Sequence, residues 1–199
     1  MFDSAIKVVY FIEFIVISIV RGIHTRPYRR MKVVVDKKTI PDLVLLGVAG
    51  VAMLLPLVFL FSSWLDFANY TLPDWAGWLG AVIFALGIWV LWRSHVDLGS
   101  NWTPTLGLRA DHQLVTDGIF KYIRHPMYAA HILWAIANPL MLHNWIAGFA
   151  LLAVTSVQYL LRIHTEEQMM LEQFGGQYET YMKTTGRIIP KIRLPPGLA

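Results

Sequence analysis

GIFKYIRHPMY, residues 118–128, sets a charged and aromatic loop directly against the start of an apolar helix. Pro126 has no backbone N–H and a fixed φ, which suits the first turn of a helix, and the residue before a proline is pushed out of the α region. The chain is therefore predicted to be extended at His125 and helical from Pro126. The free N–H groups of that helix start, together with Arg124, favour a carboxylate or a phosphate. These residues leave open an interfacial anchor, with Arg124 reaching lipid headgroups and Tyr128 in an aromatic belt.

The whole chain is too apolar for an ordinary soluble domain. Its 199 residues are 56% hydrophobic and 15% charged, against about 45–50% and 25% in typical soluble proteins. A helix that crosses a bilayer needs about 20 mostly apolar residues, and three of the apolar blocks meet that length comfortably once their flanks are counted. The blocks are Ala5–Val20, Leu43–Phe61, Trp75–Trp92, Met127–Leu142 and Trp145–Leu161. The sequence predicts an all-α integral membrane protein with about five transmembrane helices.

Basic residues gather at alternate connections between these blocks. Seven of the seventeen lie in residues 21–38, four in 93–124 and five in 162–193, whereas the connections 62–74 and 143–144 have none. Lys and Arg accumulate on the cytoplasmic side of membrane proteins, so five helices with the N-terminus outside and the C-terminus in the cytoplasm account for the pattern. The connection that begins at Arg21 is expected to bind headgroups. The net charge of +4 follows from this topology and needs no nucleic-acid partner.

The residue types present do not indicate a metal site. The chain has no cysteine, which excludes disulfides, thiolate metal sites and cysteine nucleophiles. His95 and Asp97 are two residues apart, so on a helix they do not face each other. No bound metal is expected.

Two neighbouring helices carry polar stripes that lead toward the same long connection, residues 98–121. The stripes are Tyr128, His131 and Asn138 in one helix and Thr155, Gln158 and Arg162 in the next. Their spacings keep each set roughly on one helix face, and a tight turn joins the two helices. The pair is predicted to enclose something polar at the cytoplasmic end. Interhelical hydrogen bonds without further function are the alternative.

Residues beyond the last apolar block predict two short helices. Thr165-Glu166-Glu167-Gln168 has the Thr-x-x-Gln pattern of a capping box, so a cytoplasmic helix is expected to start there. Gly175-Gly176 would end it, and Tyr178 and Tyr181 indicate another short amphipathic turn.

Taken together, these features resemble the isoprenylcysteine carboxyl methyltransferase and phospholipid methyltransferase superfamily. The matching pattern is RHPxY at 124–128, a helical hairpin, Glu166-Glu167, and FGxxYxxY at 174–181, and it covers about half of the chain. The resemblance implies an integral-membrane enzyme that moves a methyl group from S-adenosylmethionine to a lipid-borne acceptor. It divides the chain into an N-terminal three-helix region, residues 1–97, and a catalytic region, residues 98–199, within one structural domain.

The resemblance also implies the roles of individual residues. The position of the family's catalytic arginine falls on Arg162, and Glu166 is expected to act beside it. Acceptor binding is expected from His131 and Gln158 together with Arg162. The cofactor region falls on His112, Gln113, Leu114, Val115, Gly118, Tyr122, Arg124, His125, Pro126, Tyr128 and Glu167.

The chemistry of S-adenosylmethionine suits these residues. Arg124 and the helix start suit its carboxylate, and a carboxylate of the acidic pair suits its ammonium. An aromatic face from Tyr122 or Tyr128 suits the adenine or the sulfonium.

The nature of the acceptor depends on whether a proton has to be removed. A carboxylate is already ionised near neutral pH, and Arg162 can hold it by a bidentate contact. An amine needs a base, for which Glu166, His125 and His131 are candidates. The arginine on the helix stripe favours a carboxylate, as in isoprenylcysteine. Phospholipid or small-lipid N-methylation is the alternative within the class, and a non-catalytic lipid-binding membrane module is the alternative from another class.

Overall fold

The computed structural model describes residues 2–28, 35–36, 40–99, 107–108 and 113–191, and these are almost entirely helical. The α-helices are α1 (Phe2–Tyr28), α2 (Ile40–Phe61), α3 (Asp74–Leu98), α4 (Pro126–Leu142), α5 (Trp145–Phe174) and α6 (Gly176–Thr184). Two 3-10 turns are η1 (Asp66–Ala68) and η3 (Gly118–Lys121). The two-residue strands β1 (Val35–Asp36) and β2 (Gly107–Leu108) pair antiparallel.

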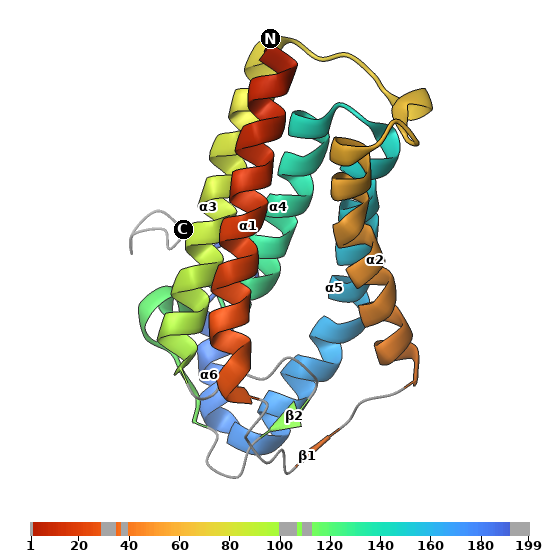
Figure 1. The fold of residues 1–199 in the computed structure, drawn as a ribbon. Coiled ribbons are helices and arrows are strands. Elements are labelled where there is room, and N and C mark those ends of the chain that lie inside the picture. Colours follow the sequence, from red (N-terminus) through yellow and green to blue (C-terminus); the bar gives the residue numbers. More distant parts are fainter. Residues whose placement is uncertain (1, 29–34, 37–39, 100–106, 109–112, 192–199) are drawn as a thin grey trace.

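The long helices form a bundle in which α1, α3 and α4 stand side by side and α2 lies along α5 (Figure 1). α4 also packs on α5 and so joins the two groups, while α6 lies across the lower end. Among the described residues, α2, α3 and α5 are long and apolar enough to cross a membrane. The predicted all-α membrane fold is confirmed. That α1 and α4 also cross, making five spans, stays a prediction.

Small residues allow α3 to approach its neighbours closely. A Cβ on Gly80 would lie 2.6 Å from Met141 Cγ of α4, and one on Gly87 would lie 3.2 Å from the Ala130 carbonyl oxygen. Close backbone approach of this kind is how helices associate where no hydrophobic effect drives them together. α4 is therefore held tightly against α3, and this fixes the polar side chains that α4 carries.

Asn138 has a structural role in this core. It is fully buried, and its Oδ1 accepts a hydrogen bond from the Tyr10 hydroxyl of α1 at 3.2 Å. The polar stripe of Tyr128, His131 and Asn138 therefore does not serve one purpose: Tyr128 and His131 line a cavity, and Asn138 does not. Its deepest member ties α4 to α1, which is the interhelical alternative left open by the sequence.

The connections without basic residues meet at one end of the bundle and the basic connections at the other. Asn144 Nδ2 donates to the Leu65 carbonyl at 2.7 Å and to Asn69 Oδ1 at 2.8 Å. The pairing of β1 with β2 brings together the α1–α2 and α3–η3 connections at the lower end of Figure 1. This arrangement agrees with the predicted segregation of basic connections.

Helix boundaries follow local sequence signals at Pro126 and Gly175 but not at Thr165. α4 begins at Pro126, after His125 at φ −123°, as predicted. α5 ends before Gly175, whose φ is +49°. The helix start expected at Thr165 is wrong, because α5 runs unbroken from Trp145 to Phe174. No Gly or Pro interrupts residues 149–174, so nothing breaks the helix near the capping pattern.

Candidate active site

A cavity of about 430 Å³ lies among all six α-helices and the segment 113–115. Its lining draws on both the N-terminal region and the catalytic region expected from the sequence. The residues predicted from sequence that line it are Gln113, Leu114, Val115, Arg124, His125, Pro126, Tyr128, His131, Gln158, Arg162 and Glu166. Residues expected to form a site from three separate stretches of the chain therefore surround one space.

The corner before α4 is held by the C-terminal segment. Ile123 and Gly186 form a parallel bridge, the Arg124 N–H donates to the Gly186 carbonyl, and the His125 N–H donates to the Arg187 carbonyl, both at 2.8 Å. This pairing satisfies backbone groups at a helix start, which would otherwise lack partners. No sequence signal predicted it, because residues 185–187 have no periodic pattern.

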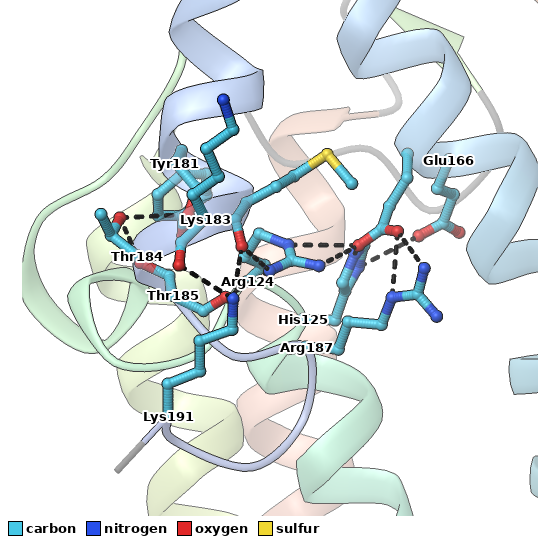
Figure 2. Close-up of polar contacts among 11 residues, drawn as sticks. Arg124, His125, Glu166, Tyr181, Lys183, Thr184, Thr185, Arg187 and Lys191 are labelled. Atoms are coloured by element: carbon cyan, nitrogen blue, oxygen red, sulfur yellow. Dashed lines mark hydrogen bonds and ion pairs between the residues drawn. The ribbon is translucent and has the colours of Figure 1, made fainter. Parts of the chain in front are cut away.

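Arg124 is occupied by protein partners, as Figure 2 shows. Its Nε and Nη2 donate to Oε1 of Glu167 at 3.1 and 2.6 Å, and its Nη1 donates to the carbonyls of Met182 and Thr185. The side chain is 5% exposed. Arg124 therefore ties together the corner, α5 and the end of α6, in addition to lining the cavity.

The two acids at 166 and 167 have different surroundings. Glu167 has a 4% exposed side chain and does not line the cavity. Its Oε2 accepts from Arg187 Nε and Nη2 at 3.0 and 2.7 Å, while Arg124 occupies Oε1. The hydrogen bond to Glu167 raises the pKa of Arg187, so this cation stays charged. Glu167, expected to contact the cofactor, is instead enclosed between two arginines.

Glu166 is the acid that lines the cavity. Its Oε1 accepts a hydrogen bond from the Tyr128 hydroxyl at 2.7 Å and lies 3.6 Å from Arg162 Nη2. Its Oε2 lies 3.6 Å from His125 Nδ1. The side chain is 26% exposed, so some of the carboxylate is available to a ligand. The proline-led corner and the acidic pair, which are about 40 residues apart in the chain, are thus in direct contact.

Arg162 also lines the cavity, one turn of α5 before Glu166. Its side chain is 12% exposed, and its Nε is buried without a hydrogen-bond partner among the described residues. Buried donors are almost always satisfied in folded proteins. An unsatisfied guanidinium N–H beside a cavity is consistent with a ligand that supplies the acceptor.

Two described residues expected around the cofactor, Tyr122 and Gly118, do not line the cavity. Tyr122 is 59% exposed and does not line the cavity. Gly118 has φ +57° and begins η3, where the next N–H, of Ile119, donates to Asp97 Oδ2 at 2.8 Å. A positive φ is readily adopted only by glycine, so Gly118 shapes the turn. His112 lies outside the described residues.

The cavity is also lined by residues that were not among the site residues expected from the sequence. Arg21 of α1 was assigned to a headgroup-binding loop, but α1 continues to Tyr28 and Arg21 lines the cavity. Tyr178 and Tyr181 of α6 also line it. Burial raises the pKa of Tyr178 to about 12, so its hydroxyl stays protonated. The polar ends of Arg21 and Thr25, spaced i and i+4, share a face, and that spacing was the available signal.

One side of the cavity is apolar. α2 contributes Leu46, Ala49, Gly50 and Met53, and a Cβ on Gly50 would meet no atom within 4 Å among the described residues. The cavity therefore combines a charged end with an apolar wall, which suits an amphipathic ligand.

Comparison with known proteins agrees with this arrangement. Residues 78–172 match the sequence model of the isoprenylcysteine carboxyl methyltransferase (ICMT) family. A protein-S-isoprenylcysteine O-methyltransferase of Dictyostelium discoideum is 30% identical over 146 residues, which cover 72% of this chain and 61% of that protein. A methanethiol S-methyltransferase of Pseudomonas deceptionensis is 31% identical over 141 residues, covering 68% of this chain and 50% of that protein.

A solved structure shares the fold. The eukaryotic intramembrane Ras methyltransferase ICMT superposes with a TM-score of 0.55 at 26% identity, over 90% of this chain and 61% of that chain. The matches thus span 50% to 61% of the length of these relatives. The resemblance noted in the sequence is confirmed for residues 78–172, which match the sequence model of the isoprenylcysteine carboxyl methyltransferase family.

Proposed function

We propose that this protein is a membrane methyltransferase that transfers a methyl group from S-adenosylmethionine to the carboxylate of a lipophilic acceptor such as isoprenylcysteine. The observation that carries the proposal is the position of Glu166, a partly exposed carboxylate in a cavity that also holds Arg162. The partly exposed Glu166 carboxylate suits the cationic methyl donor. The Arg162 Nε–H, which has no hydrogen-bond partner among the described residues, suits an anionic acceptor.

The residues present fit S-adenosylmethionine. The exposed side of the Glu166 carboxylate accepts hydrogen bonds from an ammonium group, and its negative charge favours a cationic ligand. Tyr128 holds that carboxylate in place through its 2.7 Å hydrogen bond. The rings of Tyr178 and Tyr181 border the same space and suit adenine stacking or a nearby positive charge. Gln113, an exposed residue that also lines the cavity, offers a further polar side chain.

When bound, S-adenosylmethionine supplies a methyl group activated on a sulfonium. The protein's task is to align the acceptor with that methyl group and to exclude water. A carboxylate oxygen forms the new bond to carbon while the carbon–sulfur bond breaks, which gives a methyl ester and S-adenosylhomocysteine and releases no proton. Arg162 holds and orients the carboxylate through its Nε, which has no partner among the described residues, and Gln158, one turn before Arg162 in α5, borders the acceptor.

The apolar wall on α2 receives the hydrocarbon chain of the acceptor. Leu46 and Met53 present apolar surface beside Gly50, where no described side chain fills the space. Membrane lipids surround this face of the bundle in the proposed orientation, with the N-terminus outside and the cavity end, which carries the basic connections, in the cytoplasm. The acceptor is therefore a lipophilic small molecule or a prenylated protein that reaches the cavity from the membrane.

A methyl-transfer assay tests the proposal. Purified protein is incubated with methyl-labelled S-adenosylmethionine and, in parallel, with an S-prenylated N-acetylcysteine, phosphatidylethanolamine vesicles or a small thiol. We expect label on the prenylcysteine that is released by mild base, because esters are base-labile and N-methyl and thioether groups are not. Label only on the phospholipid would favour N-methylation, label only on the thiol would favour S-methylation, and label on none would leave the non-catalytic module.

A further inference from the structure

A second arginine faces the cavity from the side opposite to α5. Arg21 of α1 lines the cavity together with His131 of α4 and His95 of α3. Its Nη1 lies 2.8 Å from Nε2 of His131. This contact joins α1 to α4 at the polar end of the cavity.

The hydrogen-bond geometry fixes His131 as a neutral imidazole. Its Nδ1 lies 2.7 Å from the Met127 carbonyl oxygen, and a carbonyl only accepts, so Nδ1 carries the hydrogen. Arginine has donors only, so Nε2 of His131 accepts from Arg21. His131 therefore positions the guanidinium without adding or cancelling charge.

Arg21 is the cavity arginine that lacks a counter-ion among the described residues. Arg162 lies 3.6 Å from Glu166 and Arg124 lies 2.6 Å from Glu167, whereas no described carboxylate lies within ion-pair distance of Arg21. An unpaired cation in an apolar, partly buried site is costly, and such groups mark ligand or ion sites in membrane proteins. The guanidinium of Arg21 is therefore expected to pair with an anionic group of the ligand.

Depth along the helices identifies which ligand group this is. In α4, His131, which contacts Arg21, lies about one turn beyond Tyr128, which bonds Glu166. In α5, Arg162 lies one turn before Glu166. Arg21 and Arg162 are therefore attached to positions further along the bundle than those that hold the Glu166 carboxylate. The apolar wall of α2 borders the same region of the cavity. An amphipathic acceptor with its chain on α2 presents its head group at this depth.

We infer that Arg21, oriented by His131, binds the carboxylate of the acceptor from the side opposite to Arg162. The inference rests on the proposed function, because it specifies the charge of the acceptor. It assigns Arg21 to acceptor selection: an anionic head group gains a charge-assisted contact that a neutral head group does not.

Ligand binding without turnover tests this assignment. Purified protein saturated with S-adenosylhomocysteine is titrated with an S-prenylated N-acetylcysteine and with its carboxamide. We expect the wild type to bind the carboxylate about 10- to 100-fold more tightly than the carboxamide, the range of one charge-assisted hydrogen bond. Arg21→Met should reduce this preference by about 10-fold, the contribution of one charge-assisted contact, to the part that Arg162 supplies, with the carboxamide affinity unchanged. Arg21→Lys should keep some of the preference for the carboxylate, because lysine retains the positive charge but lacks the planar guanidinium that forms two parallel hydrogen bonds to a carboxylate.

Two controls distinguish acceptor binding by Arg21 from a general effect of charge and from a role in cofactor binding or folding. Lys121→Met removes an exposed cation on η3 outside the cavity and should leave both affinities unchanged. Affinity for S-adenosylhomocysteine should be the same in Arg21→Met as in the wild type, which also shows that the variant is folded. A carboxylate preference that is undiminished in Arg21→Met, or a loss confined to the S-adenosylhomocysteine affinity, would overturn the assignment. Failure of the proposed function is distinct: the wild type would then bind no S-adenosylhomocysteine at all.

Discussion

Nη2 of Arg124 lies 2.6 Å from Oε1 of Glu167, and the two side chains are 5% and 4% exposed. Arg187 occupies the other oxygen of the same carboxylate at 2.7 Å. Each oxygen of Glu167 is thus held by one arginine, one from the corner before α4 and one from the C-terminal segment (Figure 2). This arrangement leaves Glu166, the neighbouring acid, as the one that faces the cavity.

Glu167→Gln should destabilise the protein strongly. The change leaves the buried Arg124 without its counter-charge, and removal of one partner from a buried ion pair costs about 3–5 kcal/mol. Thermal unfolding in detergent measures the loss. Arg187→Met is the matched control, because its side chain is 40% exposed and more exposed pairs contribute less. Equal and small losses in both variants would contradict the structural role.

Arg124→Ala should weaken cofactor binding through the same connection. The variant removes the tie between the corner and α6, so the cavity wall formed by His125 and Tyr128 loses its support. Calorimetry with S-adenosylhomocysteine measures the affinity. Normal binding in this variant would leave Arg124 with a structural role only.

Glu166→Gln should lower the affinity for S-adenosylhomocysteine while the fold is retained. The amide keeps the size of the side chain and the Tyr128 contact but loses the charge that attracts an ammonium, a loss of about 10- to 100-fold for one charge-assisted hydrogen bond. Calorimetry gives the affinity and thermal unfolding gives the stability. Unchanged affinity would remove Glu166 from the cofactor site.

Arg162→Ala should abolish turnover and leave cofactor affinity nearly unchanged. The side chain is assigned to the acceptor, so its loss removes the group that orients the attacking oxygen. Transfer of labelled methyl and titration with S-adenosylhomocysteine give the two readouts. A large loss of cofactor affinity would move Arg162 into the cofactor site.

Gly118→Ala should lower stability. Its φ of +57° is unfavourable for alanine, and the added Cβ would overlap the Asp97 carboxylate. The conformational term alone is about 1–2 kcal/mol. Gly176→Ala is the control, because no described atom lies within 4 Å of its Cβ position, and its unfolding temperature should barely change. Intact stability with a selective loss of cofactor affinity would show that Gly118 contacts the cofactor.

The sequence predicted features that depend on local chemistry. The helix start at Pro126, the helix end at Gly175 and the apolar spans follow from backbone geometry and hydrophobic length. The contact between the corner and the acidic pair followed from a family resemblance. Features that depend on distant segments of the chain were not foreseen. The pairing of residues 123–125 with 186–187 joins segments without periodicity, and the unequal roles of Glu166 and Glu167 depend on Arg187, which that pairing brings near.

Arg21 illustrates why a basic connection is a poor guide to individual residues. Seven cations lie in residues 21–38, and topology accounts for them as a group. α1 continues seven residues beyond Arg21 to Tyr28, and Arg21 lines the cavity. The i, i+4 spacing of Arg21 and Thr25 is too short a pattern to distinguish such a continuation from a loop.

Titration of the purified wild-type protein with S-adenosylhomocysteine tests the central claim most directly, namely that the cavity between the proline-led corner and Glu166 binds a sulfonium nucleotide or its product. We expect saturable binding at one site per chain, weakened in Glu166→Gln and retained in Arg162→Ala. Absence of binding by folded wild-type protein would contradict the account and leave the fold as a lipid-binding module.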